Sequence, residues 1–239
     1  MESCVIGLFT DYDGTLAPPE RAREEGAIPP ELEKVLRELS TLIPVAVVTT
    51  KDCHFVRRRV PYAAAYACIN GLEVHAGGYM AVAEGLRSAE LEQLLPLAQG
   101  LDALVEAKRT ADGRLAGITI DWRGRGGPPE GLEAVIAEAQ RLGLKVLRYS
   151  RHPFVDIYGA NRDKGDAVKI LKALLGVRHV AYMGDSENDI PAWREADVRI
   201  VVVNSLNRGL AVEGTIYIEY ADLPAYLGEV LKNIKGPEK

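Results

Sequence analysis

Short apolar runs that end in polar residues recur along the chain. Four such runs are rich in residues that favour strands, and they span residues 5–9, 44–48, 179–183 and 198–203. Continuous apolar runs of this length are typical of strands that are covered on both faces, as in a parallel sheet. The residues that follow the runs are polar: Thr10-Asp11, Thr49, Gly184-Asp185 and Asn204.

Helical patterns lie between these runs. Residues 29–39 begin with two prolines, which suit the first turn of a helix, and continue with apolar side chains at helical spacing. Residues 164–175 carry a similar apolar stripe. Alternating strands and helices with short connections predict βαβ units in an open α/β sheet. Because ligands bind outside the carboxyl ends of such strands, we expect the chemistry at Asp11, Thr49 and Asp185.

The middle of the chain, residues 76–158, has a different pattern. It predicts a helix over 89–104, a strand over 115–122, a helix over 129–142 and strands over 145–149 and 154–158. A stretch rich in glycine and proline, residues 124–129, predicts a loop. We therefore expect a small α+β domain, residues 76–158, inserted into an α/β core made of residues 1–75 and 159–239.

Composition excludes several classes of protein. The chain has 239 residues, is 47% hydrophobic and 26% charged, and carries a net charge of −5. This is the balance of a soluble globular protein, and the absence of a basic excess argues against nucleic acid as a partner. No apolar run reaches the ~18 residues of a membrane span, and residues 1–6 lack the basic start of a signal peptide. No association with a membrane is expected.

The cysteines bear on the cellular compartment. There are three of them, Cys4, Cys53 and Cys68, and none is in a Cys-x-x-Cys pair. This pattern argues against a disulfide framework or a zinc site and favours a cytoplasmic protein. The chain is poor in Gln, Met and Phe and rich in Glu, Arg and Pro, which weakly favours a heat-adapted source.

The segment Asp11-Tyr-Asp13-Gly14-Thr is the strongest chemical signal. Two carboxylates two residues apart after a strand can face one site, where one attacks a phosphorus atom and the other protonates the leaving oxygen and then activates water. Gly14 permits the tight turn that brings Asp13 back. A solvated turn is the structural alternative, because Asp and Gly are ordinary turn residues.

Three further segments complete the pattern. Asp185, in Gly184-Asp-Ser-Glu-Asn-Asp189, can join Asp11 on a hard divalent cation, although Ser, Asn and Asp also cap helices. Lys164 precedes a glycine at a predicted helix start and can hold a phosphate oxygen, or it is simply solvated. Thr49 can donate its hydroxyl to a phosphate beside the backbone N–H of Thr50, or it is an ordinary strand residue.

In this order the four segments resemble the four motifs of the haloacid dehalogenase superfamily of phosphotransferases. The resemblance covers residues 1–75 and 159–239, and it implies an α/β fold: a Rossmann-like core with a parallel sheet and a smaller α+β cap of type C2. It also implies that Asp11 is the nucleophile that forms an aspartyl-phosphate and that Asp13 is the general acid and base. Thr49 and Lys164 would then hold the phosphoryl group.

The resemblance further implies a Mg²⁺ site. Asp11, the main-chain carbonyl of Asp13, and Asp185 would bind the ion. Neighbouring polar residues, Ser186, Asn188 and Asp189, would orient its ligands or water. The ion and Lys164 would supply the positive charge that lets several carboxylates face a phosphate.

Other details resemble the trehalose-6-phosphate phosphatases, which convert that phosphosugar to trehalose and phosphate. They are the Tyr between the two aspartates, Asn70-Gly-Leu-Glu73, Glu106-Ala-Lys108 and Ile120-Asp-Trp-Arg123. The segments Thr49-Thr50-Lys51 and Gly184–Pro191 instead resemble mannosyl-3-phosphoglycerate phosphatases. On these resemblances the expected sugar-binding residues are Thr50, Lys51, Asn70, Glu106, Lys108, Arg123 and Asn161. Exposed side chains that pair with one another or with solvent are the alternative for Glu106, Lys108 and Arg123.

We therefore expect a phosphatase of a phosphorylated sugar, with trehalose 6-phosphate ahead of mannosyl-3-phosphoglycerate. The cap would close over the substrate about hinges near Gly71–Gly78 and Tyr158–Asn161. Two alternatives remain: a phosphomutase of the phosphomannomutase type, and a non-catalytic protein that binds sugar phosphates. The sequence does not define an oligomeric state.

Overall fold

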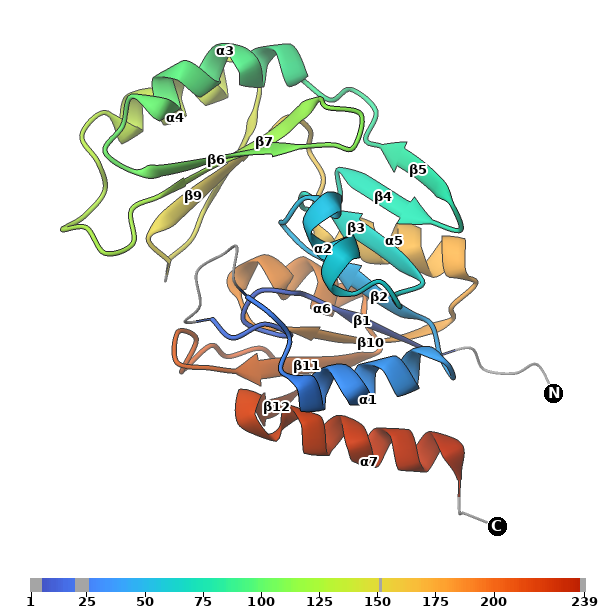
Figure 1. The fold of residues 1–239 in the computed structure, drawn as a ribbon. Helices are drawn as coiled ribbons and strands as arrows, with labels where there is room; N and C mark the ends of the chain where they lie inside the picture. Colours follow the sequence, from blue (N-terminus) through green and yellow to red (C-terminus); the bar gives the residue numbers. More distant parts are fainter. Residues whose placement is uncertain (1–5, 20–25, 151, 237–239) are drawn as a thin grey trace.

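The structure is a computed structural model that describes residues 6–19, 26–150 and 152–236. It contains two sheets, a larger one in the core and a smaller one above it (Figure 1). The predicted α/β class with a parallel sheet is confirmed. Residues 1–5, which include Cys4 and most of the segment used to exclude a signal peptide, lie outside the described residues.

The large sheet has eight strands in the order β12-β11-β10-β1-β2-β3-β4-β5. The pairs from β12 to β3 are parallel, and β4 and β5 are antiparallel additions at one edge. The strands are β1 (Ile6–Thr10), β2 (Val45–Val48), β3 (Ala65–Cys68), β4 (Glu73–Ala76), β5 (Tyr79–Val82), β10 (His179–Gly184), β11 (Val198–Val203) and β12 (Thr215–Glu219).

Helices cover both faces of the parallel part of this sheet. One face packs against apolar side chains of α1 (Pro30–Ser40), α2 (Cys53–Arg59) and α7 (Leu223–Lys235), and the other against those of α5 (Lys164–Leu175) and α6 (Ile190–Glu195). Short 3₁₀ turns, Glu187–Asp189 and Tyr220–Asp222, precede α6 and α7. Coverage on both faces explains why the central strands are continuously apolar. None of the helices in the described part of the chain is long and apolar enough to cross a membrane.

The small sheet has the order β6-β7-β9-β8 and is antiparallel. Its strands are β6 (Leu104–Arg109), β7 (Leu115–Asp121), β8 (Lys145–Arg148) and β9 (Phe154–Tyr158), and α3 (Ser88–Gln99) and α4 (Leu132–Arg141) cover its outer face (Figure 1). We call this unit the cap. Ile118, Ile120, Val155 and Ile157 point into its apolar core, so the residues between them face the large domain.

Two predicted boundaries differ from the structure by five residues or more. The helix expected over 89–104 ends at Gln99, and Leu104 already begins β6. Residues 79–82, placed in the predicted insert 76–158, instead pair with β4 in the large sheet. They do so because Gly77 and Gly78, with φ of +55° and +84°, make a tight turn that returns the chain along the same edge. The division of the chain into domains at 76 and 158 remains a prediction.

The expectation for the cysteines is wrong, because Cys53 and Cys68 form a disulfide. Cys53 begins α2 just after β2, and Cys68 ends the neighbouring parallel strand β3. Their Cα atoms are therefore 5.3 Å apart, although 15 residues separate them in the sequence. Cysteine spacing alone does not reveal a pair that is created by strand pairing.

Candidate active site

The carboxyl ends of three neighbouring strands build one wall of the site. β1 lies between β10 and β2, and its last residue, Thr10, aligns with Met183 and Val47. The first residues after the three strands therefore lie at one edge of the sheet. They are Asp11, Asp185 and Thr49, and all are buried. The structure thus brings together the strand-end residues that the sequence indicated.

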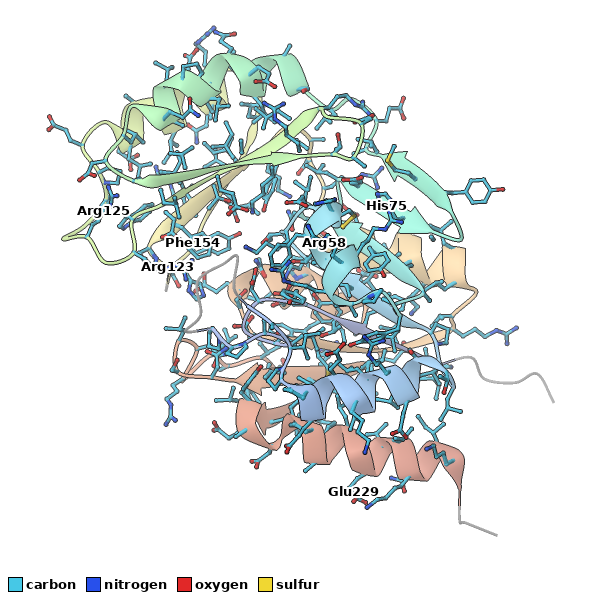
Figure 2. All side chains as sticks on the ribbon, in the orientation of Figure 1. Arg58, His75, Arg123, Arg125, Phe154 and Glu229 are labelled. Carbon is cyan, nitrogen blue, oxygen red and sulfur yellow. A yellow bond between two sulfur atoms is a disulfide. The ribbon has the colours of Figure 1, made fainter. Side chains whose placement is uncertain are left out.

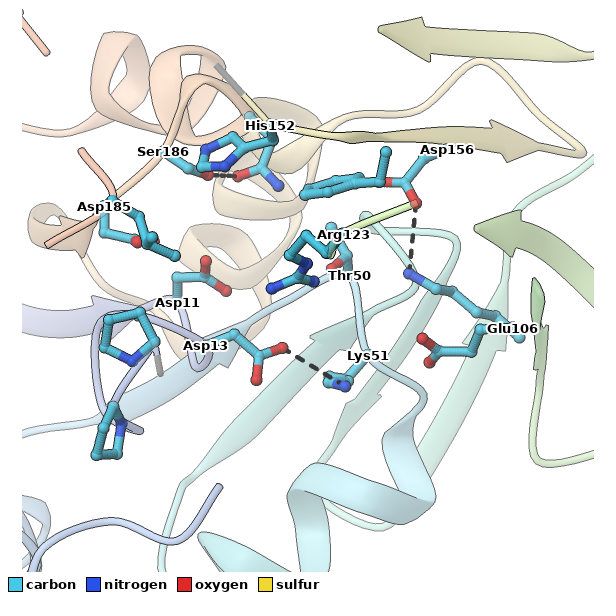
Figure 3. A pocket seen from close by; sticks show the side chains of 17 residues that line it. Asp11, Asp13, Thr50, Lys51, Glu106, Arg123, His152, Asp156, Asp185 and Ser186 are labelled. Carbon is cyan, nitrogen blue, oxygen red and sulfur yellow. Dashed lines mark hydrogen bonds and ion pairs between the residues drawn. The ribbon is translucent and has the colours of Figure 1, made fainter. Parts of the chain in front are cut away.

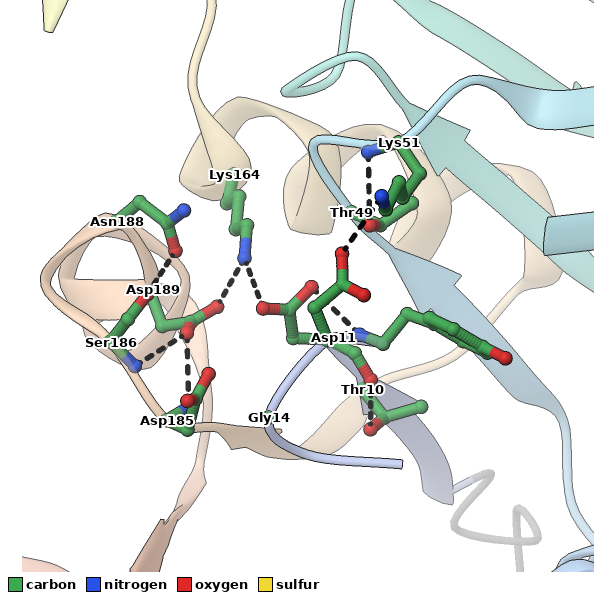
Figure 4. A network of polar contacts seen from close by, with 12 residues as sticks. Thr10, Asp11, Gly14, Thr49, Lys51, Lys164, Asp185, Ser186, Asn188 and Asp189 are labelled. Carbon is green, nitrogen blue, oxygen red and sulfur yellow. Dashed lines mark hydrogen bonds and ion pairs between the residues drawn. The ribbon is translucent and has the colours of Figure 1, made fainter. Parts of the chain in front are cut away.

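Lys164 lies at the centre of this edge (Figure 4). It is fully buried, and its Nζ is 2.9 Å from Asp11 Oδ2 and 2.7 Å from Asp189 Oδ1. Asp163 and Asp166 form a capping box that starts α5 at Lys164 and so fixes its direction. Burial acts to lower the pKa of Lys164, but the two carboxylates outweigh it and raise that pKa above its ordinary value. The lysine is therefore a permanent cation.

The carboxylates around Lys164 are held at an electrostatic cost. Asp11 Oδ1 accepts the backbone N–H of Tyr12 at 2.7 Å. Burial nevertheless raises the pKa of Asp11 to about 7, against the opposing effect of Lys164. Burial, together with the charges of Asp11 and Asp189, raises the pKa of Asp185 well above its ordinary value. Such shifts are typical of functional sites.

Asp185 is held by a residue that the motif reasoning missed. Asn204 Nδ2 donates to Asp185 Oδ2 at 2.8 Å and to the carbonyl of Gly14 at 3.0 Å. A Cβ at Gly14, where φ is +75°, would lie 2.1 Å from Asp185 Oδ2. Asn204 follows the fourth apolar run of the sequence, so the strand-end rule that pointed to Asp11 could have found it.

This donor set fits a hard divalent cation. One oxygen from each of Asp11, Asp185 and Asp189 lies within 4.8 Å of the others. The oxygens of Asp189 are already occupied: Lys164 and Tyr182 donate to Oδ1, and the backbone N–H groups of Asp185 and Ser186 donate to Oδ2. Asp11 and Asp185 are therefore the better ligands, and Asp189 positions its neighbours.

A second wall is formed by the segment after β2. Asp13, with a side chain that is 43% exposed, points into the pocket, and Lys51 Nζ lies 3.7 Å from its Oδ2 (Figure 3). Thr49 Oγ1 accepts the backbone N–H of Lys51 at 3.1 Å. Thr50 also lines the pocket. The exposed Asp13 and the buried Asp11 thus have distinct environments, as an acid–base group and a nucleophile require.

The polar face of the cap closes the pocket from the opposite side. Glu106 and Lys108 alternate along β6 and both line the pocket, together with Asp156 of β9 (Figure 3). Glu106, Thr119 and Asp156 form one row across β6, β7 and β9. The helix predicted over 89–104 ends earlier, and β6 places Glu106 and Lys108 on one face.

A buried polar network holds Asp156. Thr119 Oγ1 donates to Asp156 Oδ1, Tyr149 OH donates to Oδ2 at 2.8 Å, and Lys108 Nζ lies 3.7 Å from Oδ1. Lys108 and Asp156 are both almost fully buried. This network fixes a cation and an anion on the inner face of the cap.

The remaining predicted site residues have different positions. Arg123 lines the pocket but is held by Asp121, to which its Nη2 donates at 2.7 Å. Ser186 and Asn188 line the pocket, and Ser186 Oγ donates a hydrogen bond to Asn188 Oδ1 at 2.8 Å. Asn70 is buried and donates to the carbonyl of Arg162, and Asn161 is exposed; neither lines the pocket.

Sequence reasoning missed several pocket residues. His152 and Phe154, which stack with ring centroids 5.4 Å apart, line it together with Asp156. Asp156 could have been found from the alternation of Val155 and Ile157 with polar neighbours, which places it opposite the apolar face. His152 is in a loop, where no periodic pattern indicates a direction.

Comparisons with known proteins agree with this geometry. A family model described as sucrose-6F-phosphate phosphohydrolase matches residues 130–214. The chain is 25% identical to the glucosyl-3-phosphoglycerate/mannosyl-3-phosphoglycerate phosphatase of Persephonella marina over 250 aligned residues, which cover 89% of this chain and 91% of that relative.

Two solved structures share the fold over most of the chain. A trehalose-6-phosphate phosphatase related protein has a TM-score of 0.74 at 16% identity and covers 94% of this chain and 96% of its own. The C-terminal domain of the C. albicans trehalose-6-phosphate phosphatase has a TM-score of 0.72 at 13% identity, with coverages of 96% and 93%. The resemblance to haloacid dehalogenase superfamily phosphatases is confirmed, and the relatives agree with the predicted class of phosphoric monoester hydrolases.

Proposed function

We propose that this protein hydrolyses the phosphate ester of a phosphorylated sugar through an aspartyl-phosphate on Asp11. One observation carries the proposal: Asp11, with the buried Lys164 ammonium 2.9 Å behind it, and Asp13 lie at one end of a pocket whose other end is the polar face of the cap. A phosphate at Asp11 would leave the rest of the substrate against Glu106 and Lys108.

The chain's own residues account for both half-reactions. A carboxylate oxygen of Asp11 attacks phosphorus, the bond from phosphorus to the sugar oxygen breaks, and Asp13 gives its proton to that oxygen. Asp13 then takes a proton from water, and the resulting hydroxide attacks the aspartyl-phosphate, which releases phosphate and restores Asp11. Lys164 and Thr49 hold the phosphoryl oxygens during both steps.

Mg²⁺ is the cofactor that we propose, held by Asp11, the carbonyl of Asp13, and Asp185. When bound, it neutralises phosphate oxygens that would otherwise be repelled by the carboxylates. Asn204 keeps Asp185 in place for this role, and Asp189 keeps Lys164 in place.

Trehalose 6-phosphate is the first candidate substrate. A disaccharide presents many hydroxyl groups, and fixed charged side chains are the partners that orient them. Glu106, Lys108 and Asp156 supply such groups on a rigid sheet, and Phe154 offers an apolar surface for a sugar ring. The likeness in fold to trehalose-6-phosphate phosphatases supports this choice.

A glycosyl-3-phosphoglycerate is the second candidate, and Lys51 favours it. The Lys51 ammonium lies 3.7 Å from Asp13, the residue that we propose as the acid for the leaving oxygen. A phosphoglycerate ester carries a carboxylate close to that oxygen, so a cation at this position would bind it. The sequence relative from Persephonella marina supports this alternative.

Phosphate release from a substrate panel tests the proposal. Purified protein with Mg²⁺ is given trehalose 6-phosphate, mannosyl- and glucosyl-3-phosphoglycerate, sucrose 6-phosphate and mannose 6-phosphate, with Asp11→Asn as the inactive control. Release from one glycosyl phosphate, lost in the control, is the expected result. Lys51→Met should raise KM for a glycosyl-3-phosphoglycerate but leave KM for trehalose 6-phosphate unchanged.

Other outcomes would contradict the proposal. Transfer of phosphate between sugar positions, dependent on a sugar bisphosphate, would identify a mutase. Tight binding of a sugar phosphate with no turnover of any panel member would identify a non-catalytic binding protein.

A further inference from the structure

A second cluster of ligand-forming side chains lies apart from the active site. It is near the β5 edge of the large sheet, where α2 packs beside β3 and β4. Atoms of Cys53, Glu73 and His75 that can bind a metal lie within 4.8 Å of one another. Cys68 lies beside this cluster, because its sulfur is bonded to that of Cys53 and it pairs with Glu73 across β3 and β4. Figure 2 shows His75 on this side of the core.

Glu73 is the unusual member of the cluster. Its side chain is fully buried, and its Oε1 accepts from His75 Nε2 at 2.6 Å and from the backbone N–H of Ala111 at 3.0 Å. Among the described residues none donates a hydrogen bond to Oε2, which is also buried. A buried carboxylate oxygen without a partner is costly, so it points to a ligand that binds there.

We propose that the reduced protein binds one Zn²⁺ ion through Cys53, Cys68, Glu73 and His75. Two thiolates, an imidazole and a carboxylate are a donor set that zinc accepts in tetrahedral geometry, and thiolates are softer than the oxygen ligands that Mg²⁺ prefers. The disulfide and the zinc complex are alternative states of the same two cysteines. The proposed active site does not enter this inference.

Conversion of the disulfide form to the zinc form requires a two-electron reductant and releases protons. A dithiol reductant supplies two electrons and two protons, which break the disulfide bond and give two thiols, and the reductant becomes a disulfide. Binding of Zn²⁺ then displaces the two thiol protons into solvent. The proton on His75 Nε2 moves to Nδ1, so that Nε2 can coordinate, and Nδ1 then no longer accepts a hydrogen bond from Arg57.

Charge and access both suit the site. Two thiolates and one carboxylate with Zn²⁺ leave a net charge of −1, and the guanidinium charge of Arg57, which lies beside His75, offsets it. His75 is 11% exposed and lines a surface groove, which gives an ion a route to the buried ligands.

The position of the site gives it a structural consequence. Cys53 follows the segment that carries Thr49 and Lys51, and the Lys51 carbonyl accepts the N–H of Ile69, next to Cys68. Glu73 binds the backbone of Ala111, which belongs to the cap. The disulfide therefore ties the segment after β2 to the end of β3, and the ion would tie it also to Glu73 and so to the cap.

Cobalt titration of the full chain tests the site. Protein reduced with a phosphine and kept without oxygen is titrated with Co²⁺ in the presence of excess Mg²⁺. We expect a thiolate-to-cobalt charge-transfer band that saturates at one ion per chain and disappears when Zn²⁺ is added. The oxidised protein should show no such band. Absence of the band from the reduced protein, or an equal band in the oxidised protein, overturns the proposal.

Matched variants assign the ligands. Glu73→Gln keeps the shape of the side chain. Glu73→Gln and His75→Ala should each weaken the affinity for Zn²⁺ at least about tenfold, as measured in competition with a chromogenic chelator. Cys53→Ser should remove the band. His54→Ala and Cys4→Ser are controls that should leave the zinc affinity and the cobalt band unchanged. If Glu73→Gln unfolds at the wild-type temperature but binds zinc as tightly as the wild type, the site is not the one proposed.

Discussion

The charge balance around Lys164 leads to a prediction about stability that needs no substrate. Replacing Lys164 by Met keeps the length of a side chain that is fully buried, but removes the cation that lies 2.9 Å from Asp11 and 2.7 Å from Asp189. Removing one partner of a buried ion pair typically costs ~3–5 kcal/mol, because the other charge stays buried without compensation. We expect a loss of this size in the metal-free protein at pH 8.

The loss should depend on pH in a defined direction. Burial raises the pKa of Asp11 to about 7 even with Lys164 present, and the lysine acts to lower it. Between its unfolded pKa of ~4 and its folded pKa, the folded state binds more protons, so this carboxyl makes the protein less stable as pH rises. Without Lys164 the folded pKa increases further. The destabilisation by Lys164→Met should therefore shrink as pH falls from 8 to 5.5.

Urea unfolding of metal-free protein at the two pH values measures the effect. Lys169→Met is the matched control, since Lys169 is on the same helix but is 59% exposed in a surface ion pair with Glu195. That control should cost less than ~1 kcal/mol. A destabilisation by Lys164→Met that is equal at both pH values, or no larger than that of the control, would refute the reasoning.

Three further predictions concern the metal, the turn and the cap. Mg²⁺ binding, followed by calorimetry in two buffers, should release protons below pH 7 and be at least about tenfold weaker at pH 6 than at pH 8, because it competes with a proton on Asp11 and the raised pKa of Asp185 acts in the same direction; affinity that is independent of pH would contradict this. Gly14→Ala should lower Mg²⁺ affinity and phosphate release at least tenfold, since its Cβ would lie 2.1 Å from Asp185 Oδ2, whereas Gly124→Ala, with a similar φ of +76° in open space, should change neither. Lys108→Met should raise KM for the sugar phosphate but leave turnover of a small aryl phosphate unchanged, and equal losses on both would place Lys108 in the chemistry.

The residues that perform the proposed chemistry could be predicted because topology alone places them. Parallel strands end at one edge of the sheet, so polar residues after consecutive apolar runs meet there whatever the details of packing. Asp11, Thr49 and Asp185 meet in this way. Lys164 could be identified from its order among the motifs, and its ion pairs with Asp11 and Asp189 explain why a buried lysine is tolerated at a helix start.

The cap could be predicted less well, because its side chains depend on strand boundaries. On a strand, an error of one residue moves a side chain to the opposite face, and a strand that is not predicted, such as β6, gives no face at all. Glu106 and Lys108 were identified only through a resemblance, and Asp156 was missed. The disulfide was missed for a related reason, since strand pairing rather than spacing brings Cys53 and Cys68 together.

The two polar networks of the pocket are built on different units, and this arrangement bears on specificity. Lys164, Asp11 and Asp189 belong to the core, whereas Lys108, Asp156 and Tyr149 belong to the cap. Since the ion pairs of each network lie within its own unit, substitutions in the cap that leave Tyr149 in place can alter the sugar that is bound without disturbing the charges that act on phosphate. The two units also meet at polar contacts: Tyr149 of the cap is hydrogen-bonded to Asn188 of the core, and Glu187 of the core accepts the backbone N–H of Ser150 at 2.9 Å. Substrate choice and phosphoryl chemistry in this protein should therefore respond to mutation independently, the first in KM and the second in kcat.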